Sequence, residues 1–123
     1  MSVVDASAVL AVVNKERERV AAAALIKGGT ISPVNAAEVM QDMVKSGRTI
    51  EAAAAIFDGF GLTLAAVTRA QAVRAAELCT IPKLSIADRF CIALGEELGQ
   101  PLVTKDSQWL SLTGLKTTID FIS

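Results

Sequence analysis

The chain has 123 residues and a net charge of −1, and 52% of its residues are hydrophobic. This length is enough for one domain with a continuous core, so we expect a single domain over residues 1–123. The absence of histidine excludes Ser-His-Asp and Cys-His catalysis, imidazole zinc sites and histidine-based RNA cleavage. Tyrosine is absent as well, so any enzymatic chemistry must rest on carboxylates, together with a hard metal ion.

Composition also bears on the cellular compartment. No apolar run approaches the roughly 20 residues of a membrane span, and Asp5 lies where a signal peptide would be positively charged. Cys79 and Cys91 lack metal-type spacing and are expected to be buried thiols in a reducing compartment. We therefore expect a cytoplasmic protein without a membrane segment. Its surplus of apolar residues is largely alanine, which favours helices. The surplus apolar surface also suggests a partner protein or a homodimer.

The hydrophobic pattern predicts alternating strands and helices. The expected strands are a short buried one at Val3–Val4 followed by 30–32, 62–67, 101–104 and an edge strand within 117–121. The expected helices cover residues 6–13, 20–26, 33–46, 50–57, 69–80 and 86–98. Their boundaries carry cap residues and breakers, among them Pro33, Thr68, Ser85 and Gly99. This alternation predicts a mostly parallel sheet with helices on both faces.

Helical periodicity assigns faces to two of these helices. In helix 33–46 the predicted polar side holds Asn35, Glu38, Asp42 and Lys45. In helix 86–98 the predicted apolar stripe consists of Ile86, Ala87, Phe90, Cys91, Ala93 and Leu94, with Arg89 and Glu96 on the solvated side. Asp88 lies at the edge of the stripe, in the first turn of the helix. The Ala-rich helix near 50–60 is predicted to be core or, alternatively, to meet a second subunit.

Four acids are candidates for a functional site, although each also has a structural explanation. Asp5 ends a buried strand and could cap the following helix. Glu38 lies on a polar helix face, and Asp88 suits the first turn of a helix through the macrodipole. Asp106 could be a turn residue or the cap of a short helix at Trp109.

What these acids share is their position in an alternating α/β layout. Each lies at or just beyond the carboxyl end of a strand, the edge where open sheets bind ligands. Carboxylates crowded together raise one another's pKa, and a divalent cation relieves that repulsion. Ligands that are all oxygen favour Mg²⁺ or Mn²⁺ over zinc. Ser7 and Thr104 lie two residues from Asp5 and Asp106, and their hydroxyls could orient those carboxylates.

The acids occur in four short segments spread along the whole chain. They are Asp5-Ala6-Ser7-Ala8, Ser32-Pro33-Val34-Asn35-Ala36-Ala37-Glu38-Val39, Leu84-Ser85-Ile86-Ala87-Asp88-Arg89 and Val103-Thr104-Lys105-Asp106. In this order and spacing the chain resembles a PIN-domain ribonuclease, in particular the VapC-type toxins of bacterial toxin–antitoxin pairs. The resemblance implies a five-stranded parallel sheet flanked by helices in three layers, with an acidic pocket that holds Mg²⁺ or Mn²⁺.

Carried over by position, Asp5, Glu38, Asp88 and Asp106 match the acidic quartet of the family. The resemblance implies that Asp5 and Asp88 bind the ion directly or through water, that Asp106 lies close by, and that Glu38 holds waters or a second ion. Ser7 and Thr104 match supporting hydroxyl positions. Lys105 departs from the small residue often found before the last acid.

The implied activity is metal-assisted hydrolysis of RNA phosphodiester bonds. A net charge of −1 is unlike a general nucleic-acid binder, so we expect one structured RNA with an exposed loop, as in tRNA or rRNA. Candidate RNA contacts are Arg48, Lys83, Arg89 and Lys105. The family also implies a homodimer and an antitoxin partner whose tail covers the acidic pocket.

Two other functions remain open on the sequence. One is an aspartyl-phosphate phosphatase with Asp5 as the nucleophile, although Ser7 stands where such enzymes usually carry an acid. The other is a PIN-like binding module without catalysis, in which the acids bind a basic peptide. The presence of all four acids of the family's quartet weighs against a binding module without catalysis.

Overall fold

The computed structural model describes residues 1–123 and contains one parallel five-stranded sheet. The strands are β1 (Val3–Val4), β2 (Thr30–Ile31), β3 (Thr63–Leu64), β4 (Leu102–Thr104) and β5 (Ile119–Phe121). They lie in the order β3-β2-β1-β4-β5, and every neighbouring pair is parallel. The predicted α/β class and the edge strand near residue 120 are confirmed.

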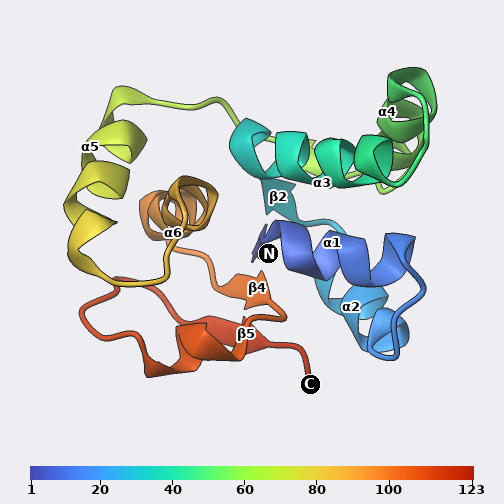
Figure 1. The fold of residues 1–123 in the computed structure, drawn as a ribbon. Coiled ribbons are helices and arrows are strands. Elements are labelled where there is room, and N and C mark those ends of the chain that lie inside the picture. The colour runs from blue at the N-terminus through green and yellow to red at the C-terminus, as the bar shows by residue number, and fades with distance from the viewer.

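Six α-helices and two short 3₁₀ segments connect these strands. They are α1 (Ala6–Val13), α2 (Arg19–Ile26), α3 (Pro33–Lys45), α4 (Ile50–Asp58), α5 (Arg69–Glu77), η1 (Leu78–Thr80), α6 (Ile86–Leu98) and η2 (Ser107–Ser111). Helices α1 to α4 lie on one side of the sheet, and α5 and α6 on the other (Figure 1). Side-chain caps at Thr68 and Ser85 fix the starts of α5 and α6, as their sequence positions predict, and Thr49 caps α4 in the same way.

Alternation along the central strands creates two cores, because neighbouring side chains point to opposite faces. Val4 and Val103 belong to the larger core, which they share with α1 to α4. Val3 and Leu102 belong to the smaller one, which contains Trp109 and the apolar side of α6. The molecule therefore has the three layers that were expected.

The strand order has a switch point between β1 and β4. From β1 the chain proceeds outward through β2 and β3, and it then returns to the other side of β1 to add β4 and β5. Open α/β sheets form a crevice at such a point, at the carboxyl ends of the strands. Asp5 follows β1 and Asp106 lies just beyond β4, so both acids lie at this crevice. Helices α3 and α6 pack against each other beside it.

Some details of the prediction were wrong. The third strand is limited to Thr63–Leu64 instead of residues 62–67, because β3 lies at the sheet edge and pairs only with β2. Both of its residues are exposed, so no burial extends the strand. Ile86, predicted in the apolar stripe of α6, is 53% exposed because it is the first residue of the helix.

Two polar residues were predicted to face solvent and do not. Asn35 is completely buried, because the first turn of α3 packs on α6 and the Asn35 side-chain amide donates to the Ala87 carbonyl oxygen at 3.2 Å. Glu96 is largely covered by α5, where Arg74 donates to it through Nε at 2.7 Å and Nη2 at 3.1 Å. Packing between helices, which a single helical wheel does not contain, explains both differences.

The cysteine prediction is half right. Cys91 is buried, whereas Cys79 is exposed on η1, and both are free thiols. Cys79 is exposed because η1 connects two helices at the surface, where its neighbour Leu78 points inward instead. None of the helices is both long enough and apolar enough to span a membrane.

Candidate active site

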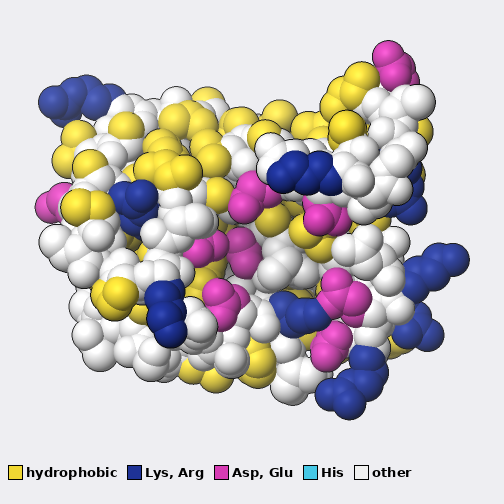
Figure 2. Space-filling model, viewed as in Figure 1, with side chains coloured by type: hydrophobic (Ala, Val, Ile, Leu, Met, Phe, Trp, Pro, Cys, Tyr) yellow, Lys and Arg dark blue, Asp and Glu magenta, His cyan; other side chains and the backbone are white.

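A pocket of about 330 Å³ opens at the switch point of the sheet. Its lining residues come from β1 and α1, from α3, from α6 and from the segment after β4: Asp5, Ala6, Ser7, Leu10, Glu38, Gln41, Asp42, Lys45, Asp88 and Asp106. Figure 2 shows acidic side chains gathered in a hollow in the middle of this face. The structure thus brings together all four acids selected from the sequence, together with Ser7.

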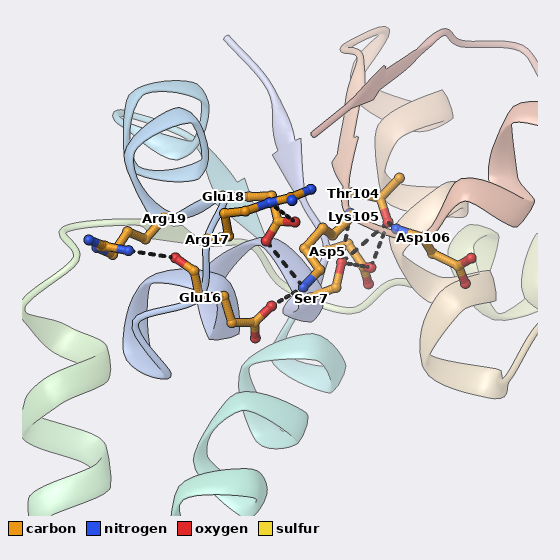
Figure 3. A network of polar contacts seen from close by, with 9 residues as sticks. All are labelled: Asp5, Ser7, Glu16, Arg17, Glu18, Arg19, Thr104, Lys105 and Asp106. Carbon is orange, nitrogen blue, oxygen red and sulfur yellow. Dashed lines mark hydrogen bonds and ion pairs between the residues drawn. The ribbon is translucent and has the colours of Figure 1, made fainter. Parts of the chain in front are cut away.

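Asp5 is the buried centre of the pocket, with only 4% of its surface exposed. Its Oδ2 accepts hydrogen bonds from Ser7 Oγ at 2.7 Å and Thr104 Oγ1 at 2.9 Å (Figure 3). Although Asp5 occupies the N-cap position of α1, its side chain makes no cap hydrogen bond. The capping explanation for this acid is therefore wrong, and its carboxylate is held toward β4 instead.

Backbone groups fix the direction of those two hydroxyl hydrogen bonds. Ser7 Oγ accepts from the Lys105 backbone N–H at 3.0 Å, and Thr104 Oγ1 accepts from the Asp106 backbone N–H at 3.1 Å. A hydroxyl has one proton to donate, and here it is directed at Asp5. Both hydroxyls therefore stabilise the ionised form of the Asp5 carboxyl. Ser7 thus orients Asp5, as its position predicts, whereas Thr104 was predicted to orient the Asp106 carboxylate and orients Asp5 instead, because the pairing of β4 with β1 places its hydroxyl there.

Glu38 is half-buried on α3 and is held by a residue that the sequence analysis did not select. The Asn35 side-chain amide donates to Glu38 Oε1 at 3.3 Å as well as to α6. Asn35 therefore links the position of Glu38 to the helix that carries Asp88. The spacing of three residues on one helix was the available signal, and the wrong assignment of Asn35 to a solvated face concealed it.

Asp88 and Asp106 do perform the structural tasks considered for them. Asp88 Oδ2 accepts from the Ser85 backbone N–H at 3.0 Å and completes a capping box at the start of α6. Asp106 Oδ1 accepts from the Gln108 backbone N–H at 2.9 Å and caps η2. Each cap occupies one carboxylate oxygen. The second oxygen accepts no hydrogen bond, so a structural role leaves these acids free to bind a ligand.

The pocket carries negative charge that the protein does not neutralise. None of the four acids forms an ion pair. Burial, together with the charge of Asp88, raises the pKa of Asp5 from 3.8 to about 6 against the opposing effect of the two hydroxyls. Burial also raises the pKa of Glu38, assisted by the charge of Asp5, and that of Asp88, assisted by the charge of Asp106. Such mutual repulsion is what a bound cation would relieve.

The donor set fits a hard divalent cation. All the candidate donors are oxygens, and each of the four carboxylates has one oxygen that receives no hydrogen bond. No three acidic or cysteine side chains close around a single point as a complete metal cage. This arrangement suits Mg²⁺, which keeps several of its waters and uses one or two carboxylates, better than an all-protein zinc or calcium site.

Two of the candidate RNA contacts lie beside the pocket, but their charged groups are engaged elsewhere. The Lys105 ammonium forms an ion pair with Glu16 and lies 3.7 Å from Glu18 Oε2, in the connection between α1 and α2 (Figure 3). The Arg89 guanidinium donates to the backbone carbonyls of Ser85 at 3.3 Å and Ala75 at 3.2 Å. Neither residue lines the acidic pocket.

The other two candidates are exposed and free of ion pairs. Arg48 lies in the connection between α3 and α4, and Lys83 lies in the loop before α6. The basic residue that does line the pocket is Lys45, at the last turn of α3, and the sequence analysis did not propose it. RNA contacts by Arg48 and Lys83 remain a prediction.

Comparison with protein-family models matches residues 2–115 to the PIN domain. The chain belongs to the PIN domain family. A search of curated proteins found no match. The predicted family and the PIN-like fold are thus confirmed.

Solved structures share this PIN fold at low sequence identity. A toxin–antitoxin complex from Klebsiella pneumoniae matches with a TM-score of 0.72 and 19% identity, covering 93% of this chain and 94% of that chain. VapBC2 from Rickettsia felis, bound to a DNA fragment from its promoter, matches with a TM-score of 0.74 and 14% identity, covering 98% and 97%. At these identities the matches establish the fold along nearly the whole length of both chains.

Proposed function

We propose that this PIN domain is a metal-dependent endoribonuclease and the toxin of a VapBC-type toxin–antitoxin pair. The observation that carries the proposal is the set of four carboxylates without ion-pair partners at the switch point of the sheet. Three of them have a raised pKa caused by burial and by one another's charge. A purely structural set of acids would be expected to have basic neighbours.

In the proposed mechanism Asp5 and Asp88 would bind Mg²⁺ or Mn²⁺ directly or through water, with Asp106 close by, and Glu38 would hold waters or a second ion. A bound ion of this kind lowers the pKa of its water and polarises the phosphate that is hydrolysed. Ser7 and Thr104 keep Asp5 anionic and correctly oriented through their donated hydrogen bonds. Asn35 does the same for Glu38. No step requires histidine.

RNA with an unpaired loop is the proposed substrate. The pocket repels a polyanion when it is empty, so attraction at this point depends on the bound cation. Lys45 is the basic residue at the pocket wall, and it could contact a phosphate next to the cleaved bond. A strand in single-stranded form can bring one phosphodiester into a pocket of this size, whereas a stiff duplex cannot.

The proposed protein partner is an antitoxin, since both similar structures contain a toxin–antitoxin pair. A basic side chain of such a partner would complement the negative pocket and compete with the metal ion. We also propose a homodimer. Exposed apolar side chains on α3 and α4 are available for it, namely Val44 at 41%, Ile50 at 54% and Ile56 at 37% exposure.

The two alternative functions make different predictions. An aspartyl-phosphate phosphatase would use Asp5 as its nucleophile, but Asp5 is buried and its Oδ2 accepts hydrogen bonds from Ser7 and Thr104. Phosphoenzyme trapping tests this function directly. A catalytically inactive binding module would keep the fold and its partner but cleave nothing. The unneutralised charge of the pocket would serve the nuclease and the binding module alike, so RNA cleavage is the measurement that separates these two.

The deciding experiment is cleavage of total cellular RNA by the purified protein with Mg²⁺ or Mn²⁺, compared with EDTA. Asp88→Asn is the informative variant, because asparagine keeps an oxygen that can accept the Ser85 cap hydrogen bond. Asp120→Asn on the exposed edge strand β5 is the matched control. We expect discrete metal-dependent fragments from wild type and the control, and none from Asp88→Asn. If the RNA remains equally intact with every protein and every metal ion, the nuclease proposal is overturned in favour of the binding module.

A further inference from the structure

A second cleft, of about 410 Å³, lies next to the acidic pocket and has no part in the function described above. One wall is the loop before α6, and the other is η2; Figure 1 shows these two segments near each other below α6. The lining residues are Ile81, Pro82, Lys83, Leu84, Gln108, Ser111 and Leu112. The cleft therefore combines an apolar floor with an ammonium, an amide and a hydroxyl group.

Both walls are attached directly to acids of the pocket. The loop that contains Lys83 and Leu84 continues into Ser85, whose backbone N–H donates to Asp88. The backbone N–H of Gln108 donates to Asp106. A strand whose phosphate lies at these two acids would therefore have its neighbouring nucleotide at the entrance of the second cleft.

The polar groups of the cleft are available to a ligand. The Gln108 side-chain amide makes no hydrogen bond within the protein, and the residue is exposed. Lys83 is exposed and free of ion pairs, and it adopts a φ of 66°, a left-handed conformation that lysine rarely takes. Residues held in such conformations cluster at binding sites.

We propose that this second cleft binds one unpaired base of the RNA strand, next to the phosphodiester that is cleaved. The apolar floor would contact the face of the base, and the Gln108 amide would read a donor and acceptor pair on its edge, a pattern that adenine presents. Lys83 would contact the adjoining phosphate. The proposal rests on the proposed function and adds a determinant of sequence preference to it.

Trp109 provides an internal reporter for the cleft. It is the only tryptophan of the chain, is 1% exposed, and packs in one cluster with Ile81, Leu84 and Leu112, all of which line the cleft. A base that enters would change the environment of this packed cluster. We therefore expect the Trp109 emission to change when the cleft is filled, whether or not any RNA is cleaved.

The experiment measures binding of fluorescein-labelled five-nucleotide RNAs, oligo(rA), oligo(rC) and oligo(rU), by anisotropy with Ca²⁺, a hard cation with oxygen ligands, in place of Mg²⁺. Gel analysis of each sample after the measurement verifies that the RNA is intact. Trp109 emission is recorded with the unlabelled RNAs. The variants are Gln108→Ala with Ser107→Ala as its control on the same segment, and Lys83→Ala with the exposed, unpaired Lys27→Ala as its control. Neither control residue lines the cleft.

We expect oligo(rA) to bind wild type most tightly and to change the Trp109 emission. Gln108→Ala should weaken oligo(rA) binding about tenfold and remove the preference among bases. Lys83→Ala should weaken all three RNAs alike and reduce the salt dependence of binding by roughly one phosphate contact. The controls should bind as wild type does.

Three results would overturn the proposal. They are equal binding by wild type and Gln108→Ala, absence of binding to every RNA, and an effect of Gln108→Ala only on association with a partner protein. RNA cleavage is measured separately, so a failed nuclease assay with intact base-selective binding refutes the catalytic proposal alone. Intact cleavage with an unchanged sequence preference in Gln108→Ala refutes the cleft alone.

Discussion

Replacing Asp5 by asparagine should stabilise the metal-free protein at neutral pH. The pKa of Asp5 is about 6 in the folded chain against an ordinary 3.8, chiefly because of burial and the nearby charge of Asp88. Between these two pH values the folded state binds more protons than the unfolded state, so the free energy of unfolding falls as the pH rises from about 4 to about 6. The full pKa difference corresponds to about 3 kcal/mol of unfolding free energy that the wild-type protein loses as the pH rises. Asp5→Asn has no carboxylate to ionise at this position and does not lose it.

The gain from Asp5→Asn should therefore depend on pH. We expect no gain near pH 4 and a gain of up to about 3 kcal/mol at pH 7.5, equivalent to a Tm increase on the order of 10 °C. Urea unfolding in EDTA, followed by the fluorescence of the single buried Trp109, measures it. Asp120→Asn, on the exposed part of β5, is the control and should change little at either pH.

Mg²⁺ provides the second half of this test. Adding Mg²⁺ should raise the Tm of wild type and of Asp120→Asn, because a ligand that binds only the folded state stabilises it by mass action. The Tm of Asp5→Asn should not respond. A loss of stability in Asp5→Asn that is equal at pH 4 and pH 7.5 would refute the reasoning. It would mean that Asp5 acts mainly as the acceptor for Ser7 and Thr104.

Three further changes test separate parts of the structure. Thr104→Val removes a hydroxyl that donates to Asp5 at 2.9 Å, so it should cost about 1 kcal/mol at pH 7.5 and less near pH 4, as measured by urea unfolding. Arg74→Leu leaves the largely buried Glu96 carboxylate without its two guanidinium hydrogen bonds, and should cost about 2 kcal/mol in Mg²⁺ and EDTA alike. Asn35→Ala removes the hydrogen bonds to Glu38 and to the Ala87 carbonyl oxygen. It should lower metal-dependent RNA cleavage roughly tenfold in cleavage kinetics, with a smaller effect on Mg²⁺ affinity in calorimetry. Unchanged cleavage would show that Glu38 needs no such support.

The parts of the fold that could be predicted depend on local chemistry. Thr49, Thr68 and Ser85 each accept a backbone hydrogen bond from a residue three positions later, so a short window of sequence contains both partners. The alternation of Val3 and Val4 between two cores follows from the strand repeat of two. The convergence of Asp5 and Asp106 follows from the topology of parallel sheets, which places the carboxyl ends of all strands at one edge. Glu38 and Asp88 are not at strand ends and reach the same edge on α3 and α6.

The parts that could not be predicted depend on contacts between distant residues. Thr104 is 99 positions from the carboxylate that it orients, and only the pairing of β4 with β1 brings the two together. The ion pair of Lys105 with Glu16 spans 89 positions and directs a predicted RNA contact toward the connection between α1 and α2. Asn35 has the sequence context of a solvated helix face, and its burial follows from the packing of α3 on α6.

The charge of the pocket also bears on how an acidic chain could act on a polyanion, as the proposed function requires. With a net charge of −1 and no ion pair at its four acids, the metal-free pocket repels phosphate. On the proposed function the bound cation would offset part of this negative charge and offer a positive centre to a phosphate oxygen, so phosphate would bind at this point only when the site is able to hydrolyse it. A basic side chain from an antitoxin would relieve the same repulsion between Asp5, Glu38 and Asp88 without supplying a reactive water. Inhibitor and metal ion would then compete for one unneutralised set of carboxylates, which is the simplest physical reason for a partner to cover this pocket.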